Sequence, residues 1–290
     1  MKVLATRRYP GVAWDELRDV EVGSVEALRD DVDVLVVANE PVDLDRFPAL
    51  RLIANFGVGY DRIDVAASAA RGVAVTNTPG VLDAAVADLT FALILAVRRR
   101  IVEGDMRIRR GEWRGSWPDQ FLAEDVAGAT LGIVGLGRIG RAVARRAEGF
   151  DMRVVSVRSS DPADRVDELV RESDVLTLHV PLTPQTRGMI DARRLGLLRD
   201  GACLVNTARG EIVDEPALVA ELVSGRIRAG LDVFAHEPAV PEELLELPNV
   251  VLTPHLGSAT RQTREAMTRL VVDNLLALAR GAPAVTPVLT

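Results

Sequence analysis

The chain has 290 residues, enough for two domains of ordinary size, because most domains contain about 100 to 200 residues. Hydrophobic residues make up 48% of it and aromatic residues 4%, and Val/Ile/Leu runs alternate with Ala/Arg/Glu/Leu runs, which is typical of a globular α/β protein. The formal net charge is -7, and Lys/Arg residues form no block apart from acidic ones, which argues against nucleic acid as a partner.

Neither secretion nor membrane insertion is indicated. The N-terminus becomes charged at Lys2 and Arg7, which is too early for a signal peptide. The most apolar predicted helix, Ala84–Val97, is interrupted by Asp88. The single cysteine, Cys203, lies in an apolar run and has no partner for an internal disulfide, so we expect a core thiol and a cytoplasmic protein.

The first ninety or so residues alternate short apolar runs with amphipathic segments, which predicts parallel strands joined by right-handed crossovers. The segments are Val3–Ala5, Val12–Val20, Val32–Ala38, Leu52–Phe56 and Val73–Thr76. Gly57-Val58-Gly59 ends one predicted strand, and Pro79-Gly80 precedes a long helix that begins near Asp83.

From residue 131 the alternation restarts with stronger signals and predicts six strands of a doubly wound sheet. These strands are Leu131–Val134, Val154–Val157, Val175–Leu178, Cys203–Asn206, Ala229–Val233 and Val250–Leu252. A last helix is predicted over Thr263–Ala279.

The most informative motif is a strand that runs into a glycine-rich turn and then a helix. Residues 130–140 read Thr-Leu-Gly-Ile-Val-Gly-Leu-Gly-Arg-Ile-Gly, and a helical segment, Arg141–Glu148, follows. In such a G-x-G-x-x-G turn, Gly135 allows the tight turn, Gly137 lets a pyrophosphate approach the backbone, and Gly140 lets helix and strand pack closely. The helix N-terminus also attracts phosphate. We therefore predict a dinucleotide site rather than a purely structural turn.

The residues after the next predicted strand bear on the choice of cofactor. About 20 residues past the glycines, this fold usually has an acid that holds the ribose 2′-hydroxyl of NAD. The chain has Arg158, Ser159 and Ser160 there, and no carboxylate before Asp161. A guanidinium with two hydroxyls suits a 2′-phosphate, so we expect a preference for NADP. NAD stays open as the alternative, in which Asp161 reaches back to the ribose.

Three polar motifs follow predicted strands in the second half of the chain. They are Asn-Thr-Ala-Arg-Gly at 206–210, Leu-Asp-Val-Phe-Ala-His-Glu-Pro at 231–238, and Thr-Pro-His-Leu-Gly-Ser at 253–258. In an open α/β sheet the carboxyl ends of the strands share one crevice with the cofactor, so Arg209, Glu237 and His255 can meet. We interpret the other two histidines, His179 and His236, as structural.

The residue types of this trio match the reduction of a 2-oxo acid. Arg209 offers a planar fork to the carboxylate and the carbonyl oxygen of the substrate. His255 can donate a proton near neutral pH and take it back in the reverse reaction. Glu237 would orient the imidazole and stabilise its protonated form.

With these motifs in place, the chain resembles the D-isomer-specific 2-hydroxyacid dehydrogenases, and among them the glyoxylate/hydroxypyruvate reductases. The resemblance covers nearly the whole chain. The motifs that carry it lie at residues 55–61, 75–80, 132–140, 179–183, 206–210, 232–238 and 253–258.

The resemblance implies roles for individual residues. Arg209 would bind the substrate, and His255 would be the acid/base with Glu237 as its partner. Backbone N–H groups around Val58 and Gly59 would receive the substrate carboxylate. The cofactor would contact Arg138, Ile139, Pro181, Thr186, Thr207, Ala208, Asp232 and Gly257, in addition to the residues named above. No metal ion is expected.

The resemblance also implies an architecture. A flavodoxin-like substrate domain of residues 1–93 and 262–290 would carry an inserted Rossmann cofactor domain, residues 94–261. A homodimer is expected, with the helix from Asp83 and the segment Trp113–Phe121 at its interface. The spacing around Trp117 departs from that of the reductases, so a contact of this side chain with the partner's site stays open.

Two kinds of alternative stay open. Phosphite and 3-phosphoglycerate dehydrogenases have the same fold, although the latter commonly add a regulatory domain that we do not expect here. A corepressor similar to the C-terminal-binding proteins would keep the fold and the cofactor but bind peptides, because fold alone does not determine function. That group usually carries extensions beyond the core, which we also do not expect.

Overall fold

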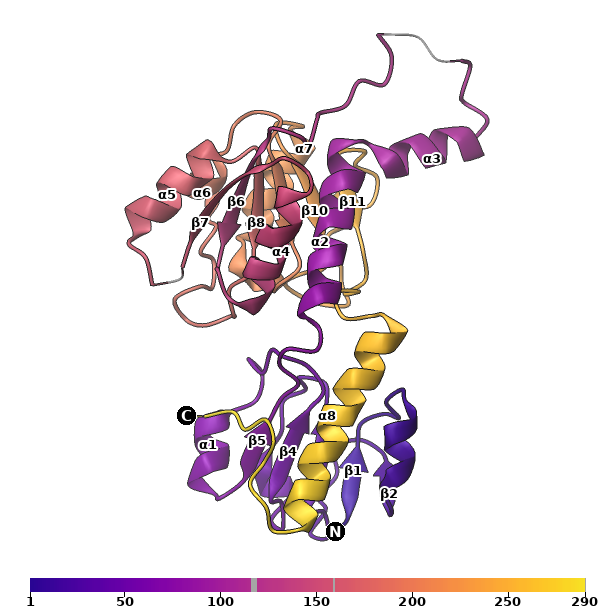
Figure 1. The fold of residues 1–290 in the computed structure, drawn as a ribbon, viewed down its shortest axis with the longest axis vertical. Coiled ribbons are helices and arrows are strands. Elements are labelled where there is room, and N and C mark those ends of the chain that lie inside the picture. Colours follow the sequence, from indigo (N-terminus) through magenta and orange to yellow (C-terminus); the bar gives the residue numbers. More distant parts are fainter. Residues whose placement is uncertain (116–118, 159, 290) are drawn as a thin grey trace. The chain divides into compact units, whose positions relative to one another are not determined.

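The computed structural model describes residues 1–115, 119–158 and 160–289. The chain forms two compact units, Met1–Leu82 with Ser258–Thr290 and Asp83–Gly257, which we call unit 1 and unit 2 (Figure 1). We placed the first crossing at residue 93, which lies inside helix α2 (Asp83–Arg98). The whole helix belongs to unit 2, because its buried Phe91, Leu93 and Ile94 join the core on one face of that unit's sheet.

Unit 1 is built on a parallel sheet of five strands. In chain order they are β1 (Val3–Ala5), β2 (Val20–Val22), β3 (Val34–Val37), β4 (Leu52–Asn55) and β5 (Ala74–Thr76). Their order in the sheet is β2-β1-β3-β4-β5, the flavodoxin-like order that the resemblance implied. We did not predict β2 as a strand, because it has three residues, lies at the edge and buries none of them.

Helices cover this sheet. They are the 3-10 helices η1 (Val12–Glu16) and η2 (Leu44–Arg46) and the α-helices α1 (Val65–Ala70) and α8 (Arg261–Ala279). Helix α8 packs along β4 and η1 (Figure 1). It begins after Thr260, whose hydroxyl accepts a hydrogen bond from the Thr263 N–H at 3.2 Å, a common way to satisfy a free donor at a helix start.

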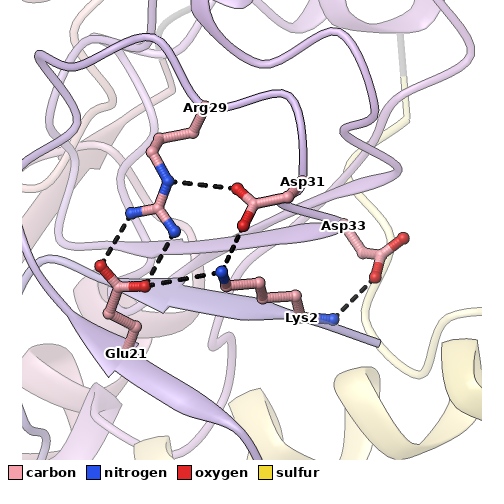
Figure 2. Close-up of polar contacts among 5 residues, drawn as sticks. All are labelled: Lys2, Glu21, Arg29, Asp31 and Asp33. Atoms are coloured by element: carbon pink, nitrogen blue, oxygen red, sulfur yellow. Dashed lines mark hydrogen bonds and ion pairs between the residues drawn. The ribbon is translucent and has the colours of Figure 1, made fainter.

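An exposed cluster of charges lies at the amino ends of β1 and β3 (Figure 2). Arg29 donates to both carboxylate oxygens of Glu21, at 2.7 and 2.8 Å, and to Asp31 at 3.1 Å. The Lys2 ammonium pairs with Asp31, and the Lys2 backbone N–H donates to Asp33 at 2.7 Å. Hydrogen bonds from Lys2 and Arg29 lower the pKa of Asp31 to about 2. Every charge in this cluster therefore has a partner.

Unit 2 is built on a parallel sheet of six strands. They are β6 (Thr130–Val134), β7 (Arg153–Val157), β8 (Val175–Leu178), β9 (Cys203–Asn206), β10 (Arg228–Leu231) and β11 (Val250–Leu252). The order is β11-β10-β9-β8-β6-β7, so the direction of strand succession reverses at β6. Ligands of doubly wound sheets bind at the carboxyl end of such a switch point, and the glycine-rich turn directly follows β6.

Helices lie on both faces of this sheet. Besides α2, they are α3 (Ile101–Arg109), α4 (Arg138–Glu148), α5 (Ala163–Glu172), α6 (Ala192–Leu195) and α7 (Glu215–Val223), with the 3-10 helices η3 (Gly210–Ile212) and η4 (Glu242–Leu244). The cores on the two faces are formed by α2 and α4 on one side and by α5, α6 and α7 on the other. The inner strands β6, β8, β9 and β10 are buried on both faces over most of their length and read as continuous apolar runs, which made them predictable. The edge strands β7 and β11 are only partly buried and were predicted from their Val-rich sequences. In the described ranges, no helix is long and apolar enough to span a bilayer.

Candidate active site

The glycine-rich turn after β6 has the geometry of a dinucleotide loop. Gly135 has a φ of 101°, and a Cβ there would lie 2.5 Å from the carbonyl oxygen of His179. A Cβ on Gly140 would lie 2.0 Å from the carbonyl oxygen of Gly135, so this glycine permits the close packing of α4 on the loop. A Cβ on Gly137 would meet nothing within 4 Å. The space beside Gly137 is therefore open to a ligand, as a pyrophosphate site requires.

The start of helix α4 faces this open space. Gly137 is the N-cap residue, and no side chain caps the helix. Backbone N–H groups of the first turn, including those of Arg138 and Ile139, thus stay available, and together with the helix dipole they favour an anion. The residues present fit a dinucleotide.

The loop after β7 bears on the ribose end of that site. The Arg158 side chain is exposed, and its backbone N–H donates to a carboxylate oxygen of Asp161 at 2.8 Å. Asp161 does reach back, but to the backbone of its own loop. Ser159, which we predicted as a cofactor contact, lies outside the described residues, as does Trp117.

Glu237 and His255 form the central pair of unit 2. The Nδ1 atom of His255 lies 2.8 Å from Oε2 of Glu237, while Oε1 of Glu237 accepts a hydrogen bond from the Phe234 N–H at 3.1 Å. Burial alone would raise the pKa of Glu237, but the hydrogen bond and charge of His255, the Phe234 N–H and the charge of Arg209 together lower it. The carboxylate is therefore ionised beside the imidazole, and Nε2 of His255 is the ring nitrogen left for proton transfer.

Arg209 lies on the tight loop that follows β9. The Asn206 side chain accepts a hydrogen bond from the Ala208 N–H at 3.0 Å and donates to the Arg209 carbonyl at 2.8 Å, which holds the loop in shape. A Cβ on Gly210 would lie 2.0 Å from the backbone of Phe234, so only glycine lets this loop approach the one after β10. The structure thereby brings Arg209, Glu237 and His255 into one cluster, as their strand-end positions predicted.

Asp232 fixes the loop that carries His255. Its side chain is fully buried, and one oxygen accepts from the Thr253 hydroxyl and the Leu256 N–H, both at 2.6 Å. The other oxygen accepts from the Gly257 N–H at 2.9 Å. Burial raises the pKa of Asp232 although these donors oppose the rise. His255 itself has a φ of 53°, an unusual conformation for a non-glycine residue that this network sustains.

The loop after β4 is the corresponding feature of unit 1. The Asn55 side-chain amide donates to the carbonyls of Gly57 at 3.2 Å and Gly59 at 2.7 Å, and the Asn77 amide donates to the Val58 carbonyl at 2.9 Å. All three carbonyls are thus occupied. The N–H groups of Val58 and Gly59 donate to no acceptor in the described part of the chain. Such unpaired donors form an anion-binding concavity.

The comparisons with known proteins agree on one family. A model of the D-isomer specific 2-hydroxyacid dehydrogenase NAD-binding domain matches residues 91–257, more than half of the chain. This chain belongs to the D-isomer-specific 2-hydroxyacid dehydrogenase family. The oxidoreductase class and the nicotinamide cofactor that we expected are confirmed, as is the fold of two parallel-sheet α/β domains.

Individual family members are similar over almost their whole length. The chain is 47% identical to a protein of Pyrococcus furiosus named glyoxylate reductase, over 92% of this chain and 85% of that one. A solved structure from Thermus thermophilus matches all of both chains with a TM-score of 0.93 and 44% identity. The NADPH-dependent glyoxylate/hydroxypyruvate reductase of Sinorhizobium meliloti, solved with NADP and malonate, matches with a TM-score of 0.89 and 37% identity over 99% of this chain and 96% of that one.

Several residues that we expected to contact the cofactor form hydrogen bonds within the protein. The Thr186 hydroxyl donates to the Pro181 carbonyl at 2.6 Å and accepts from the Thr183 N–H at 2.8 Å, which closes the loop after β8. The Thr207 hydroxyl lies 3.1 Å from that of Thr90 on α2. Their contact with a cofactor stays a prediction.

The remaining histidines fit the structural interpretation that we gave them. Burial lowers the pKa of His179 to about 3, and its Nε2 atom lies 3.0 Å from the Thr177 hydroxyl. This imidazole is neutral and does not serve as a proton donor near pH 7. His236 is exposed, and its carbonyl accepts a hydrogen bond from the Ala239 N–H in a turn.

Sequence reasoning missed the positioning residues. Thr253, Asn55 and Asn77 act through other groups, and each lies inside a motif that we did single out but was given no role of its own. A polar residue next to a loop that must expose N–H groups is the signal that could have found the two asparagines.

Proposed function

We propose that the enzyme reduces small 2-oxo acids, glyoxylate and hydroxypyruvate above all, with a reduced nicotinamide cofactor, and oxidises D-2-hydroxy acids in reverse. The observation that carries this proposal is the Glu237–His255 pair at 2.8 Å, with the Arg209 charge acting on it, in the unit that holds the dinucleotide loop. The names of the relatives from P. furiosus and S. meliloti support the choice of substrate.

In this proposal the bound cofactor supplies the hydride to the carbonyl carbon, and the chain supplies everything else. Arg209 binds the carboxylate and the carbonyl oxygen of the substrate. The N–H groups of Val58 and Gly59 favour a carboxylate as well, the role that the family resemblance gives them. Nε2 of protonated His255 donates the proton to the carbonyl oxygen as the hydride arrives. Glu237 holds Nδ1 and stabilises the imidazolium before the transfer.

A panel of 2-oxo acids, assayed with NADPH and with NADH, tests the reaction. We expect oxidation of the reduced cofactor with glyoxylate and with hydroxypyruvate. If neither acid is reduced with either cofactor while phosphite or 3-phosphoglycerate is oxidised, the substrate assignment is wrong. If the protein binds the cofactor and turns over none of these compounds, the result favours the corepressor-like alternative over the enzymatic function.

We further propose a preference for NADP. The exposed Arg158 guanidinium is available to a 2′-phosphate, and the Asp161 carboxylate is engaged by the Arg158 N–H, which argues against a role at the ribose of NAD. We expect a higher kcat/KM with NADPH than with NADH, and Arg158→Gln should remove most of the difference. A clear preference for NADH in the unaltered enzyme would refute this proposal.

A homodimer is the assembly that we propose. No residue of helix α3 is buried, and its apolar side chains Ile101, Val102, Met106 and Ile108 are exposed. A groove of about 1090 Å³, lined by residues of α3, η4 and β11, lies beside them. Exposed apolar surface of this kind favours association with a second copy. Light scattering after size exclusion should give twice the 31.3 kDa chain mass, and Ile108→Glu should shift it toward the single chain.

The cytoplasmic location stays a prediction.

A further inference from the structure

The loop that carries Glu237 is held by hydrogen bonds to two carboxylates. The Phe234 N–H donates to Oε1 of Glu237 at 3.1 Å. The next N–H along the chain, that of Ala235, donates to Oε1 of Glu215 at 2.9 Å. The first bond closes within the loop, whereas the second reaches helix α7, which begins at Glu215. Glu215 therefore ties the loop of Glu237 to another element of unit 2.

Glu215 is available for this contact because another residue caps its helix. Asp214 is the N-cap residue of α7, and its side chain accepts a hydrogen bond from the Ala217 N–H at 3.2 Å. Position 216 is proline, which has no N–H to offer. The Asp214 N–H donates to the carbonyl of the buried Ile190 at 2.9 Å, which fixes the start of the helix. The Glu215 carboxylate thus reaches the loop from an anchored position.

The peptide bond between Phe234 and Ala235 also contacts the loop that carries Arg209. A Cβ on Gly210 would lie 2.0 Å from the Phe234 carbonyl carbon and 2.2 Å from the Ala235 nitrogen, so the two loops touch with no side chain between them. Arg209 directly precedes Gly210 in the chain. A shift of this peptide would therefore displace Glu237 on one side and Arg209 on the other.

Small displacements of Glu237 matter for its partner. Its Oε2 atom lies 2.8 Å from Nδ1 of His255, and hydrogen bonds weaken steeply as their geometry departs from the optimum. The charges of His255 and Arg209 act on Glu237, and the charge of His255 also acts on Asp232. Among these groups Glu237 supplies the carboxylate bonded to the imidazole, so stabilisation of the imidazolium depends on where the loop holds that carboxylate.

We propose that Glu215 is a positioning residue, which through its hydrogen bond to the loop keeps Glu237 aligned with His255. The inference rests on the proposed function, because Glu237 and His255 perform the proton transfer of that reaction. Glu215 acts through the Ala235 N–H and takes no part in proton transfer itself. Its role complements that of Asp232, which fixes the loop on the His255 side of the pair.

Steady-state reduction of glyoxylate across pH tests this role. Glu215→Ala leaves the Ala235 N–H without its acceptor, so kcat should fall by about tenfold while KM for the reduced cofactor stays within about twofold. The alkaline limb of kcat/KM should move about half a pH unit to lower pH. Glu215→Gln keeps an acceptor oxygen and should recover most of the loss. Glu243→Ala, the same change at an exposed position in the first turn of η4, is the control and should match the unaltered enzyme.

A double-mutant cycle shows whether Glu215 acts through Glu237. Once Glu237→Gln has removed the carboxylate, the addition of Glu215→Ala should move the alkaline limb no further. Additive shifts in the double variant would overturn the inference, and so would a Glu215→Gln enzyme as impaired as Glu215→Ala. A lower Tm of Glu215→Ala with an unchanged kcat and pH profile would show that Glu215 only supports the fold.

An NMR titration gives a reading that needs no turnover. The chain has three histidines, and His255→Gln identifies the signal of His255. In Glu215→Ala the titration midpoint of this signal should fall, because the imidazolium is less well stabilised, and an unchanged midpoint would also overturn the inference. Absence of 2-oxo acid reduction by the unaltered enzyme would instead contradict the proposed function. If Glu215→Ala does not fold, Glu215→Asp, which is shorter by one methylene group, loosens the same hydrogen bond and answers the same question.

Discussion

The two sheets present different kinds of chemistry at the carboxyl ends of their strands. In unit 2 these ends carry ionisable side chains, with Glu237 and His255 joined by a hydrogen bond of 2.8 Å. In unit 1 the loop after β4 offers backbone N–H groups, held in place by Asn55 and Asn77. In the mechanism that we propose, this difference lets one parallel-sheet architecture supply proton transfer in one unit and anion recognition in the other. Substitutions in unit 2 should therefore lower kcat, and those in unit 1 should raise KM.

The largest effect is expected at the proton donor. His255→Gln should lower kcat for 2-oxo acid reduction by about 10²- to 10⁴-fold, because general acid catalysis contributes that much. The dissociation constant of the reduced cofactor should stay nearly constant, since the glycine loop is untouched. His236→Gln, on an exposed turn of the same unit, is the control and should have no effect. If kcat of His255→Gln stays within about tenfold of that of the unaltered enzyme, His255 is not the proton donor.

The next effect concerns the support of that histidine. In the unaltered protein, the Asp232 carboxylate accepts hydrogen bonds from the N–H groups of Leu256 and Gly257. Asp232→Asn replaces one carboxylate oxygen by an amide N–H₂ group, which cannot accept a hydrogen bond and faces one of these two donors. A buried donor left unpaired costs about 1–3 kcal/mol, so Tm should fall and kcat should fall by about tenfold or more as the His255 loop shifts. Thermal unfolding and steady-state kinetics measure both. Loss of cofactor affinity alone, with kcat retained, would indicate that Asp232 acts on the cofactor instead.

The pH dependence probes the pair itself. Glu237→Gln removes the negative charge that stabilises the imidazolium, so the alkaline limb of kcat/KM for reduction should move to lower pH. A move of one pH unit corresponds to about 1.4 kcal/mol. Glu148→Gln, at the exposed end of α4, alters the net charge equally and should leave the profile in place. An unchanged profile for Glu237→Gln would count against its role.

A smaller effect should follow from loosening the loop of unit 1. Asn77→Ala removes the hydrogen bond to the Val58 carbonyl, so the neighbouring N–H groups lose part of their alignment. KM for glyoxylate should rise several-fold while kcat and the KM for the cofactor stay close to their original values. A fall in kcat at constant KM would contradict the expectation that substitutions in unit 1 affect substrate binding and not the chemical step.

The smallest effect is expected at the exposed charge cluster (Figure 2). Glu21→Gln should leave activity unchanged and lower Tm by about 2 °C at most, because exposed ion pairs contribute little and salt screens them. The pKa of Asp31 is about 2, below its unfolded value of 3.8. Its contribution is therefore present above about pH 4 and is lost as the pH falls through about 2. Thermal unfolding at several pH values and salt concentrations checks both statements.

Strongly patterned elements were predictable, and weakly patterned ones were not. The strand over Val175–Leu178 was predicted with its observed bounds, because it is buried on both faces. We missed α3, whose apolar residues Ile101 and Ile108 point to solvent rather than to a core. Strand β2 was missed for the related reason that none of its residues is buried. A pattern of burial can be read from a sequence only where burial occurs.

The sequence by itself determined the α/β class and the dinucleotide turn, and it predicted Arg209, Glu237 and His255 as the catalytic residues. Each of these depends on residue type and on local order along the chain, which a sequence states directly. Only the tertiary structure decided that Asp232 holds the His255 loop and that amides occupy the carbonyls around Val58. These facts depend on which groups meet across strands and helices, because partnership and burial are properties of the folded chain.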